Sequence, residues 1–212
     1  PISLLSGGSM MYIDAVCNGI DDIPTILPEI REKMMKRLEA EGLEQMCNLL
    51  RELDPEHWKI VDRNNPRRVI HALEICIQTG KTYTSFRSNT IKDRPFNIIK
   101  VGLNRDRDEL YNRINQRVLD MIEEGMIEEA LQVYPKRTLN SLNTVGYKEL
   151  FEYLDGLTTL DEAIFKIQSN TRRYARKQLT WYKKDTAFQW FNPDNIEEIL
   201  NYVHTMISNT SK

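Results

Sequence analysis

Helical spacing of apolar residues, restarted repeatedly by proline and glycine, is the feature that most constrains the fold of this chain. Pro28 and Pro66 suit the first helical position, where the missing N–H costs nothing, and apolar residues follow each at three- and four-residue steps. Helices are therefore expected over residues 10–16, 28–38, 43–50, 54–60, 65–80, 106–125, 126–133, 148–153, 161–184 and 195–206.

Short apolar runs predict strands at residues 1–6, 96–103 and 188–191. The first would enter a Gly7-Gly8 turn and then a helix capped by Ser9, a layout that can set backbone N–H groups near an anion but is often only a turn. Strand–helix pieces at both ends, separated by a helical block, predict an α/β core over 1–20 and 96–212 with a helical insertion over 21–95.

Composition narrows the class of protein. The chain has 212 residues, of which 41% are hydrophobic and 28% charged, and no apolar run is long enough to span a membrane. The first residues resemble neither a signal peptide nor a natural start, so we expect a fragment cut within a domain. Three scattered cysteines and three isolated histidines predict free thiols in a reducing cytoplasm and no metal-ligating residues.

Charge is distributed unevenly along a chain whose net charge is only −2. Residues 21–60 are rich in acids, whereas residues 63–68 and 166–184 are basic. Binding to a polyanion depends on local basic surface and not on the total, so these two stretches are candidates for contact with nucleic acid.

The strongest candidate is the helix around residues 170–184. Its apolar face, expected to include Tyr174, leaves Arg172, Arg173, Arg176 and Lys177 mostly on other faces, where guanidinium groups can fork onto phosphate oxygens. Trp181 or Tyr182 is expected to supply a ring for base stacking. The alternative is an ordinary solvated basic face.

Two further arginine pairs stand at helical spacing. Arg67 and Arg68 occupy a first helical turn, which disfavours positive charge, so we expect either a bound anion or pairing with Glu56 or Asp62. Arg113 and Arg117 share one helix face beside an apolar stripe. As partly buried like charges they would need an anion such as a diphosphate, or else Asp106 or Glu109.

A glycine with a ring and a cation beside it marks the segment Leu142-Asn-Thr-Val-Gly-Tyr-Lys. Gly146 permits an unusual backbone angle or a close approach, and Tyr147 and Lys148 follow it directly. Alone, this pattern indicates only a junction between a loop and a helix.

Together, and in this order, the motifs resemble the tRNA dimethylallyltransferase family over nearly the whole chain. The motifs are Gly7-Gly8-Ser9-Met10-Met11-Tyr12, Arg63-Asn-Asn-Pro-Arg-Arg-Val-Ile-His-Ala-Leu-Glu, Arg113-Ile-Asn-Gln-Arg117, Val145-Gly-Tyr-Lys and Thr171-Arg-Arg-Tyr-Ala-Arg-Lys-Gln-Leu-Thr-Trp181. Ser9 stands where the family usually has Thr, and Asn65 where it usually has Asp.

The resemblance implies an α/β, P-loop-type core with short parallel strands, mostly helical in this chain, and an inserted helical domain. It implies a cytoplasmic, monomeric enzyme without membrane contact that transfers a dimethylallyl group from dimethylallyl diphosphate to N6 of the adenosine 3′ of the tRNA anticodon, after that base is flipped out. Mg²⁺ would be held mainly by a segment upstream of residue 1.

Roles for individual residues follow from the same resemblance. Arg117 and Ser9 are expected at the reacting centre, with Arg113 and Arg117 on the diphosphate. Residues expected to contact the tRNA are Arg67, Arg68, His71, Thr144, Gly146, Tyr147, Lys148, Arg176, Lys177, Gln178 and Trp181.

Three other functions fit parts of the sequence. A non-catalytic RNA-binding module would bind tRNA without responding to dimethylallyl diphosphate. A P-loop kinase or transferase acting on a small molecule would show no salt-sensitive RNA affinity. A purely structural helical protein would lose no ligand on reversal of charge at Arg172, Arg173 and Arg176.

We predict that residues 1–212 alone do not catalyse prenyl transfer, because the family's phosphate loop, Gly-x-x-x-x-Gly-Lys-Ser/Thr, does not occur in them and its catalytic Asp is expected upstream. The measurement is incorporation of labelled dimethylallyl groups into tRNA by the purified 212-residue chain. Robust incorporation would contradict the prediction.

Overall fold

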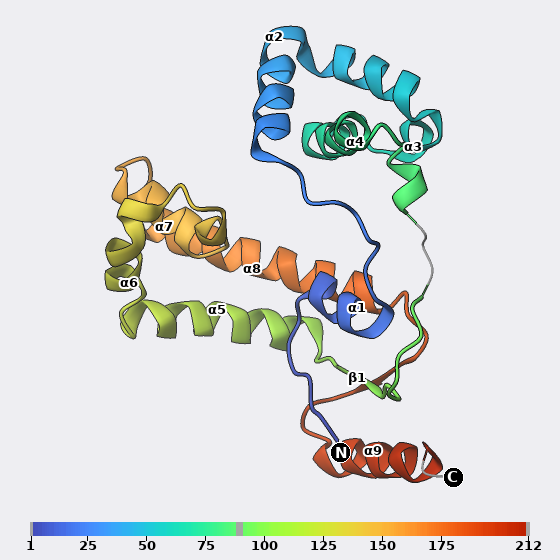
Figure 1. Ribbon diagram of the computed structural model, residues 1–212. Coiled ribbons are helices and arrows are strands. Elements are labelled where there is room, and N and C mark those ends of the chain that lie inside the picture. The colour runs from blue at the N-terminus through green and yellow to red at the C-terminus, as the bar shows by residue number, and fades with distance from the viewer. Residues whose placement is uncertain (1, 88–90, 211–212) are drawn as a thin grey trace. The chain divides into compact units, whose positions relative to one another are not determined.

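The computed structural model describes residues 2–87 and 91–210, and the chain divides into two compact units (Figure 1). The core unit comprises residues 1–13 with 96–212, and the helical unit residues 14–95. Each is described by itself. The helical unit begins within α1 (Met10–Asn18), because Lys92 N–H donates to the Asn18 carbonyl at 2.9 Å and Arg94 Nη2 to the Ala15 carbonyl at 2.5 Å.

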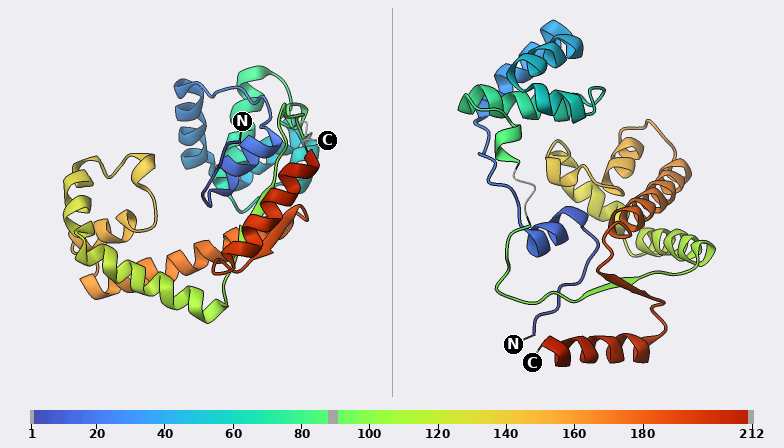
Figure 2. Two further views of the ribbon diagram at one scale, coloured as in Figure 1. Left: turned by 90° about the horizontal axis from the view of Figure 1, so that it is seen from below. Right: turned by 90° about the vertical axis from the view of Figure 1, so that its right-hand side faces the viewer.

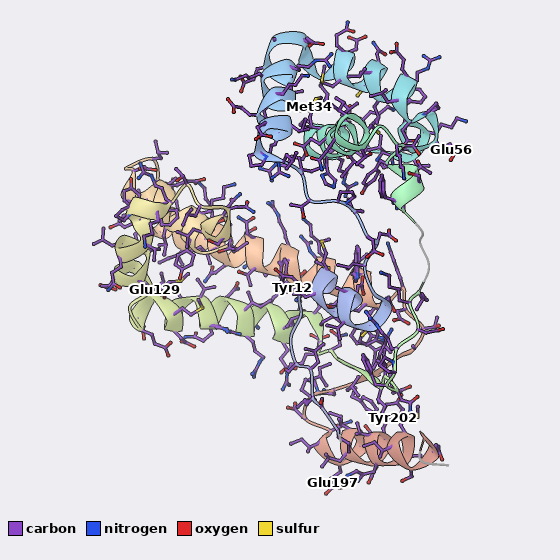
Figure 3. All side chains as sticks on the ribbon, viewed as in Figure 1. Tyr12, Met34, Glu56, Glu129, Glu197 and Tyr202 are labelled. Carbon is purple, nitrogen blue, oxygen red and sulfur yellow. The ribbon has the colours of Figure 1, made fainter. Side chains whose placement is uncertain are left out.

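The helical unit contains α2 (Pro28–Leu53), α3 (Pro55–Ile60), α4 (Pro66–Thr79) and a 3₁₀ turn (Thr84–Phe86). Proline opens each α-helix, as the sequence predicts, and Gly42 at φ 81° breaks α2 at the boundary expected between two helices. The buried cluster lies between α2 and α4, where Met34 in Figure 3 belongs to the packed face. Its buried members are Met34, Met46, Leu50, Val61, Val69, Ile70, Ala72 and Leu73.

A buried carboxylate ties the helices of this unit to the 3₁₀ turn. Asp54, only 1% exposed, caps α3 by accepting from the His57 N–H at 3.0 Å. It also accepts from Thr84 N–H and Thr84 Oγ1, both at 2.8 Å. Burial alone would raise the pKa of Asp54, but these hydrogen bonds to the charged form outweigh it and lower the pKa.

In the core unit, four α-helices lie in the sequence between two strands that pair with each other. β1 (Lys100–Leu103) and β2 (Phe188–Phe191) are parallel, with Lys100 opposite Phe188 and Leu103 opposite Phe191. Between them lie α5 (Arg107–Glu123), α6 (Met126–Val133), α7 (Tyr147–Leu154) and α8 (Leu160–Tyr182), with 3₁₀ turns at Tyr134–Lys136 and Asn140–Leu142; α9 (Ile196–Thr210) follows β2.

The long helix α8 packs against both α5 and α7 (Figures 1 and 2). The buried cluster formed by these helices and α6 consists of Val118, Met126, Ala130, Leu150, Phe151 and Ile167. Within the described ranges, none of the helices is long and apolar enough to cross a bilayer.

Two strand predictions need correction. Residues 2–6 are not a strand, and Ile2 and Leu4 are exposed, because no described segment pairs with them. The strand expected over 96–103 is confined to Lys100–Leu103, the stretch that pairs with β2. There Gly102 leaves room for the Trp190 indole, since a Cβ at Gly102 would lie 2.6 Å from a ring carbon.

We predict that acid destabilises the helical unit through His57. Burial lowers the pKa of His57 from its usual 6.5, with Arg87 and His71 adding to the shift and Asp54 opposing it. The unfolded chain therefore binds more protons than the folded one as pH falls below about 6.5, and stability decreases. The pKa of Asp54 is lowered in the folded protein, so the helical unit loses further stability as pH falls below the ordinary Asp pKa of 3.8.

The measurement is urea unfolding between about pH 7.5 and about pH 5, where His57 dominates this difference. His57→Phe should flatten the pH dependence while retaining a ring against Tyr83, whose centroid lies 4.7 Å from that of His57. His204→Gln, at an exposed position, is the matched control. Equal pH dependence in all three proteins would contradict the prediction.

Candidate nucleic-acid interface

Helix α8 carries four of the expected site residues of the core unit, namely Arg176, Lys177, Gln178 and Trp181. It packs against α5 and α7, which lie at or beside most of the others. Thr159 and Glu162 start it with a reciprocal capping box, at 3.3 Å from Glu162 N to Thr159 Oγ1 and 2.9 Å from Thr159 N to Glu162 Oε2. Ala163 and Ile167 are buried, which fixes the rotation of the helix. Tyr174, expected to face inward, is 43% exposed because it lies beyond this buried stripe.

The arginines of α8 divide into bound and available groups. Arg172 Nη1 donates to Asn115 Oδ1, and its guanidinium carbon lies 6.0 Å from the centre of the Tyr111 ring. Arg176 and Lys177 are exposed and, across residues 2–87 and 91–210, have no carboxylate within ion-pair distance. Arg173 is also exposed, although its Nη1 donates to Asn170 Oδ1 at 3.3 Å. The basic surface of α8 therefore comprises Arg173, Arg176 and Lys177.

The two aromatic candidates at the end of α8 differ in access. Tyr182 is only 9% exposed and packs on Phe188, with 5.2 Å between ring centroids. Trp181 is 43% exposed. Of the two rings, Trp181 is the one with surface available for stacking on a base.

Gln178 contacts the expected Gly7-Gly8 turn, which the structure shows as irregular backbone without a turn. Its Nε2 donates to the Gly8 carbonyl at 2.7 Å, and a Cβ at Gly8 would lie 2.1 Å from that nitrogen. Ser9, the next residue, is exposed, and its carbonyl accepts from Ile13 N–H in the first turn of α1. The structure thus brings Ser9 to the C-terminal half of α8.

Arg113 and Arg117 lie on α5 on either side of Asn115, whose carbonyl accepts from Gln168 of α8 at 3.2 Å. Both arginines are exposed, which corrects the expectation that they are partly buried; Val118 carries the buried face instead. The acids named as alternatives are engaged elsewhere: Asp106 caps α5 and Glu109 pairs with Arg105 at 2.7 Å.

The segment Thr144–Lys148 enters α7 through Gly146, whose φ of 106° favours glycine. Thr144 and Lys148 are exposed. The Tyr147 hydroxyl donates to Glu129, which raises the pKa of Tyr147, and the ring stacks on Phe151 with 6.1 Å between centroids. Tyr147 is therefore oriented by contacts inside the core unit.

Glu149 is a residue that the sequence patterns alone did not identify. It is 4% exposed and accepts from Gly146 N–H at 2.8 Å and from Asn170 Nδ2 of α8 at 2.7 Å. An acid three residues after an N-cap position is a recognisable signal for the first of these bonds. The second depends on the packing of α7 against α8, which no local pattern reveals.

The helical unit carries the remaining expected residues. Asn65 caps α4 by accepting from Arg68 N–H at 3.3 Å, and Arg67 and Arg68 are exposed in the first turn. Pairing with Glu56 or Asp62 is not found among the described residues. His71 is partly engaged, with Nδ1 at 3.6 Å from the buried Glu74.

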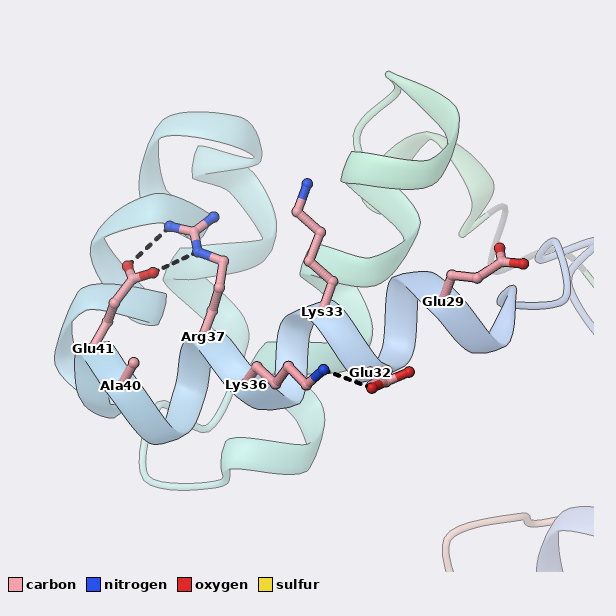
Figure 4. Close-up of a pocket in the computed structure, with 7 residues that line it drawn as sticks. All are labelled: Glu29, Glu32, Lys33, Lys36, Arg37, Ala40 and Glu41. Atoms are coloured by element: carbon pink, nitrogen blue, oxygen red, sulfur yellow. Dashed lines mark hydrogen bonds and ion pairs between the residues drawn. The ribbon is translucent and has the colours of Figure 1, made fainter.

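The surface depression drawn in Figure 4 is not a candidate site. All seven residues that line it belong to α2, and its charges pair with one another as Lys36–Glu32 and Arg37–Glu41. In the part of the chain that the structure describes, no three His, Cys, Asp or Glu side chains come together in a way that could hold a metal ion.

Residues 1–185 match the family model described as IPP transferase. The chain belongs to the IPP transferase family. It is 63% identical over 203 residues to tRNA dimethylallyltransferase 1 of Phocaeicola vulgatus, covering 96% of this chain and 68% of that protein. It is 59% identical to tRNA dimethylallyltransferase 1 of Bacteroides fragilis, covering 97% and 68%.

Solved structures of this family share the fold. The full-length tRNA isopentenylpyrophosphate transferase of Bacillus halodurans matches with a TM-score of 0.59 at 35% identity, over 95% of this chain and 65% of that one. A eukaryotic dimethylallyltransferase acting on tRNA matches with a TM-score of 0.75 at 22% identity, over 96% and 56%. The family and its P-loop-type fold confirm the class expected from the sequence.

We predict that Gly146→Ala destabilises the core unit by about 1–3 kcal/mol, because a side chain is strained at this backbone conformation. A Cβ would also lie 2.5 Å from Met126 Cε, although that methyl group can move. The measurement is urea unfolding, with Val145→Ala, at an exposed neighbouring position, as the control. Equal stabilities would contradict the prediction.

Proposed function

We propose that this chain forms the tRNA-binding part of a cytoplasmic tRNA dimethylallyltransferase. The observation that carries the proposal is that one helix, α8, holds the exposed cations Arg173, Arg176 and Lys177 and contacts both the Gly8 backbone, next to Ser9, and α7. The names of the relatives supply the substrate class, since each is a tRNA dimethylallyltransferase.

The anticodon stem-loop is the proposed partner of this surface. Arg176 and Lys177 bind backbone phosphates, because both are exposed and without an internal carboxylate among the described residues. Trp181 offers a ring for stacking, and Thr144 and Lys148 offer polar groups at the start of α7. Arg67 and Arg68, both exposed on the helical unit, are proposed separately as tRNA-binding cations of that unit.

The proposed reaction forms a bond between N6 of the flipped adenosine and the allylic carbon and breaks the bond from that carbon to the diphosphate oxygen. The diphosphate leaves with the electron pair, and N6 loses a proton to a base. The charge that develops on the leaving oxygen is stabilised by nearby cations. Arg117, assisted by Arg113, is proposed for this role because both guanidinium groups are exposed on α5 and, among the described residues, neither has a carboxylate within ion-pair distance.

One further substrate-binding assignment rests on the contact between Gln178 and Gly8. Ser9 presents an exposed hydroxyl next to the Gly8 carbonyl that Gln178 binds, so we assign it to the donor side of the reacting centre. Mg²⁺ is proposed as a cofactor of the full-length enzyme on the strength of the family resemblance alone.

We predict that Arg176→Gln weakens binding of the anticodon stem-loop and reduces the slope of log K against log salt by about 0.7–1, the loss of about one phosphate contact. The measurement is fluorescence anisotropy at several salt concentrations. Lys33→Gln, which removes an exposed cation from the α2 depression in Figure 4, is the charge-matched control and should leave the slope unchanged. An unchanged slope for Arg176→Gln would contradict the assignment.

A companion measurement separates this function from simple RNA binding. Full-length protein should transfer the dimethylallyl group, and dimethylallyl diphosphate should be consumed only when tRNA is present. Binding of the stem-loop without any transfer by the full-length protein would favour the non-catalytic RNA-binding module.

A further inference from the structure

A chain of hydrogen bonds joins the segment Thr144–Lys148 to the basic surface of α8. Gly146 N–H donates to Glu149 Oε2 at 2.8 Å, and Asn170 Nδ2 donates to Glu149 Oε1 at 2.7 Å. Asn170 Oδ1 in turn accepts from Arg173 Nη1 at 3.3 Å. Three contacts therefore connect a backbone amide of the loop to an exposed guanidinium of the helix.

The groups at the two ends of this series of hydrogen bonds fix the orientation of the Asn170 amide between them. Glu149 is 4% exposed, and within residues 2–87 and 91–210 no cation lies within ion-pair distance of it. A buried carboxylate requires donors, and the Asn170 amide meets this need by turning its NH₂ group toward Glu149. Its carbonyl oxygen then faces Arg173, so the amide dipole lies between a negative and a positive group in the favourable direction.

Attachment of α7 to α8 does not depend on this chain alone. Lys166 Nζ of α8 donates to Glu152 Oε2 of α7 at 2.9 Å, one turn away, and Leu150, Phe151 and Ile167 pack in the shared buried cluster. What Glu149 adds is a bond to Gly146, the residue whose φ of 106° sets the entry of the loop into the helix.

We propose that Glu149 and Asn170 are positioning residues that hold Thr144–Lys148 in register with Arg173, so that one RNA backbone meets both at once. This inference rests on the proposed function of the surface as a tRNA-binding site. The residues themselves do not touch RNA, because Glu149 is buried and the Asn170 amide is used at both ends.

The test is a substitution that breaks the chain and a second that restores it. Asn170→Ala removes the link while favouring the helix, and Asn170→Asp sets two carboxylates against each other. Each should raise the Kd for anticodon stem-loop RNA about tenfold, the effect of losing roughly one buried hydrogen bond. Glu149→Gln should also raise the Kd, because the amide at position 149 has one acceptor oxygen where the carboxylate has two. It can then accept from Gly146 N–H or from the Asn170 NH₂ group in their present orientations, but not from both.

The double variant E149Q/N170D exchanges the two groups and restores every contact. The introduced amide oxygen accepts from Gly146 N–H, its NH₂ group donates to the introduced carboxylate, and that carboxylate accepts from Arg173. We expect the Kd of the double variant to return to within about twofold of the unsubstituted protein, a strong departure from additivity.

The measurements use full-length protein at a temperature where circular dichroism shows every variant to be folded. Glu152→Gln, which breaks the other polar contact between α7 and α8, is the control and should leave the Kd unchanged. The KM for dimethylallyl diphosphate should stay constant in all variants.

Two results would overturn the inference: lower melting temperatures with unchanged Kd, or a double variant as weak as the single ones. If the unsubstituted protein does not bind the stem-loop, the proposed function itself fails. If it binds and either of the two results above is found, only the inference about Glu149 and Asn170 fails.

Discussion

The packing of α8 against α5 on one side and α7 on the other is the constraint on which the core unit depends. Side chains along α8 donate hydrogen bonds to each neighbouring segment. Lys166 donates to Glu152 of α7, and Gln168 and Arg172 donate to Asn115 of α5. Near the end of the helix, Gln178 donates to the Gly8 carbonyl. The twelve residue steps from Lys166 to Gln178 span about 18 Å of helix. A rigid helix of this length sets the spacing of three segments that are far apart in the sequence.

The internal hydrogen bonds of the arginines decide which of them remain for a ligand. Arg172 is satisfied by Asn115 and lies over Tyr111, and Arg105 is satisfied by Glu109 and Asp194. Arg117 is exposed and, among the described residues, has no carboxylate within ion-pair distance. Guanidinium groups without internal partners remain solvated, and they exchange water and counterions for phosphate at little cost in protein structure.

The sequence predicted the helices well because proline and glycine mark their ends and their apolar spacing is regular. The prediction of β2 at residues 188–191 is confirmed, and β1 is shorter than predicted. Of the strand expected at residues 1–6, residue 1 lies outside the described residues, and the prediction is wrong for residues 2–6 because a strand requires a partner, which local composition does not reveal.

The candidate surface was less predictable than the fold. Helical periodicity set Arg113 and Arg117 beside an apolar stripe but not whether they were covered, which depends on the packing of α5. The role of Glu149 depends on Asn170, 21 residues later, and the role of Gln178 on Gly8, 170 residues earlier. Local patterns identify residue types, whereas these contacts arise only when the helices pack.

The short sheet influences the candidate surface through the end of α8. A parallel pair of four-residue strands is marginal alone, but the Lys100–Asp185 ion pair at 2.6 Å and the packing of Trp190 over Gly102 stabilise it. Phe188, the first residue of β2, packs on Tyr182, the last residue of α8. Because Trp181 directly precedes Tyr182, this buried contact anchors the end of α8 that carries the exposed indole.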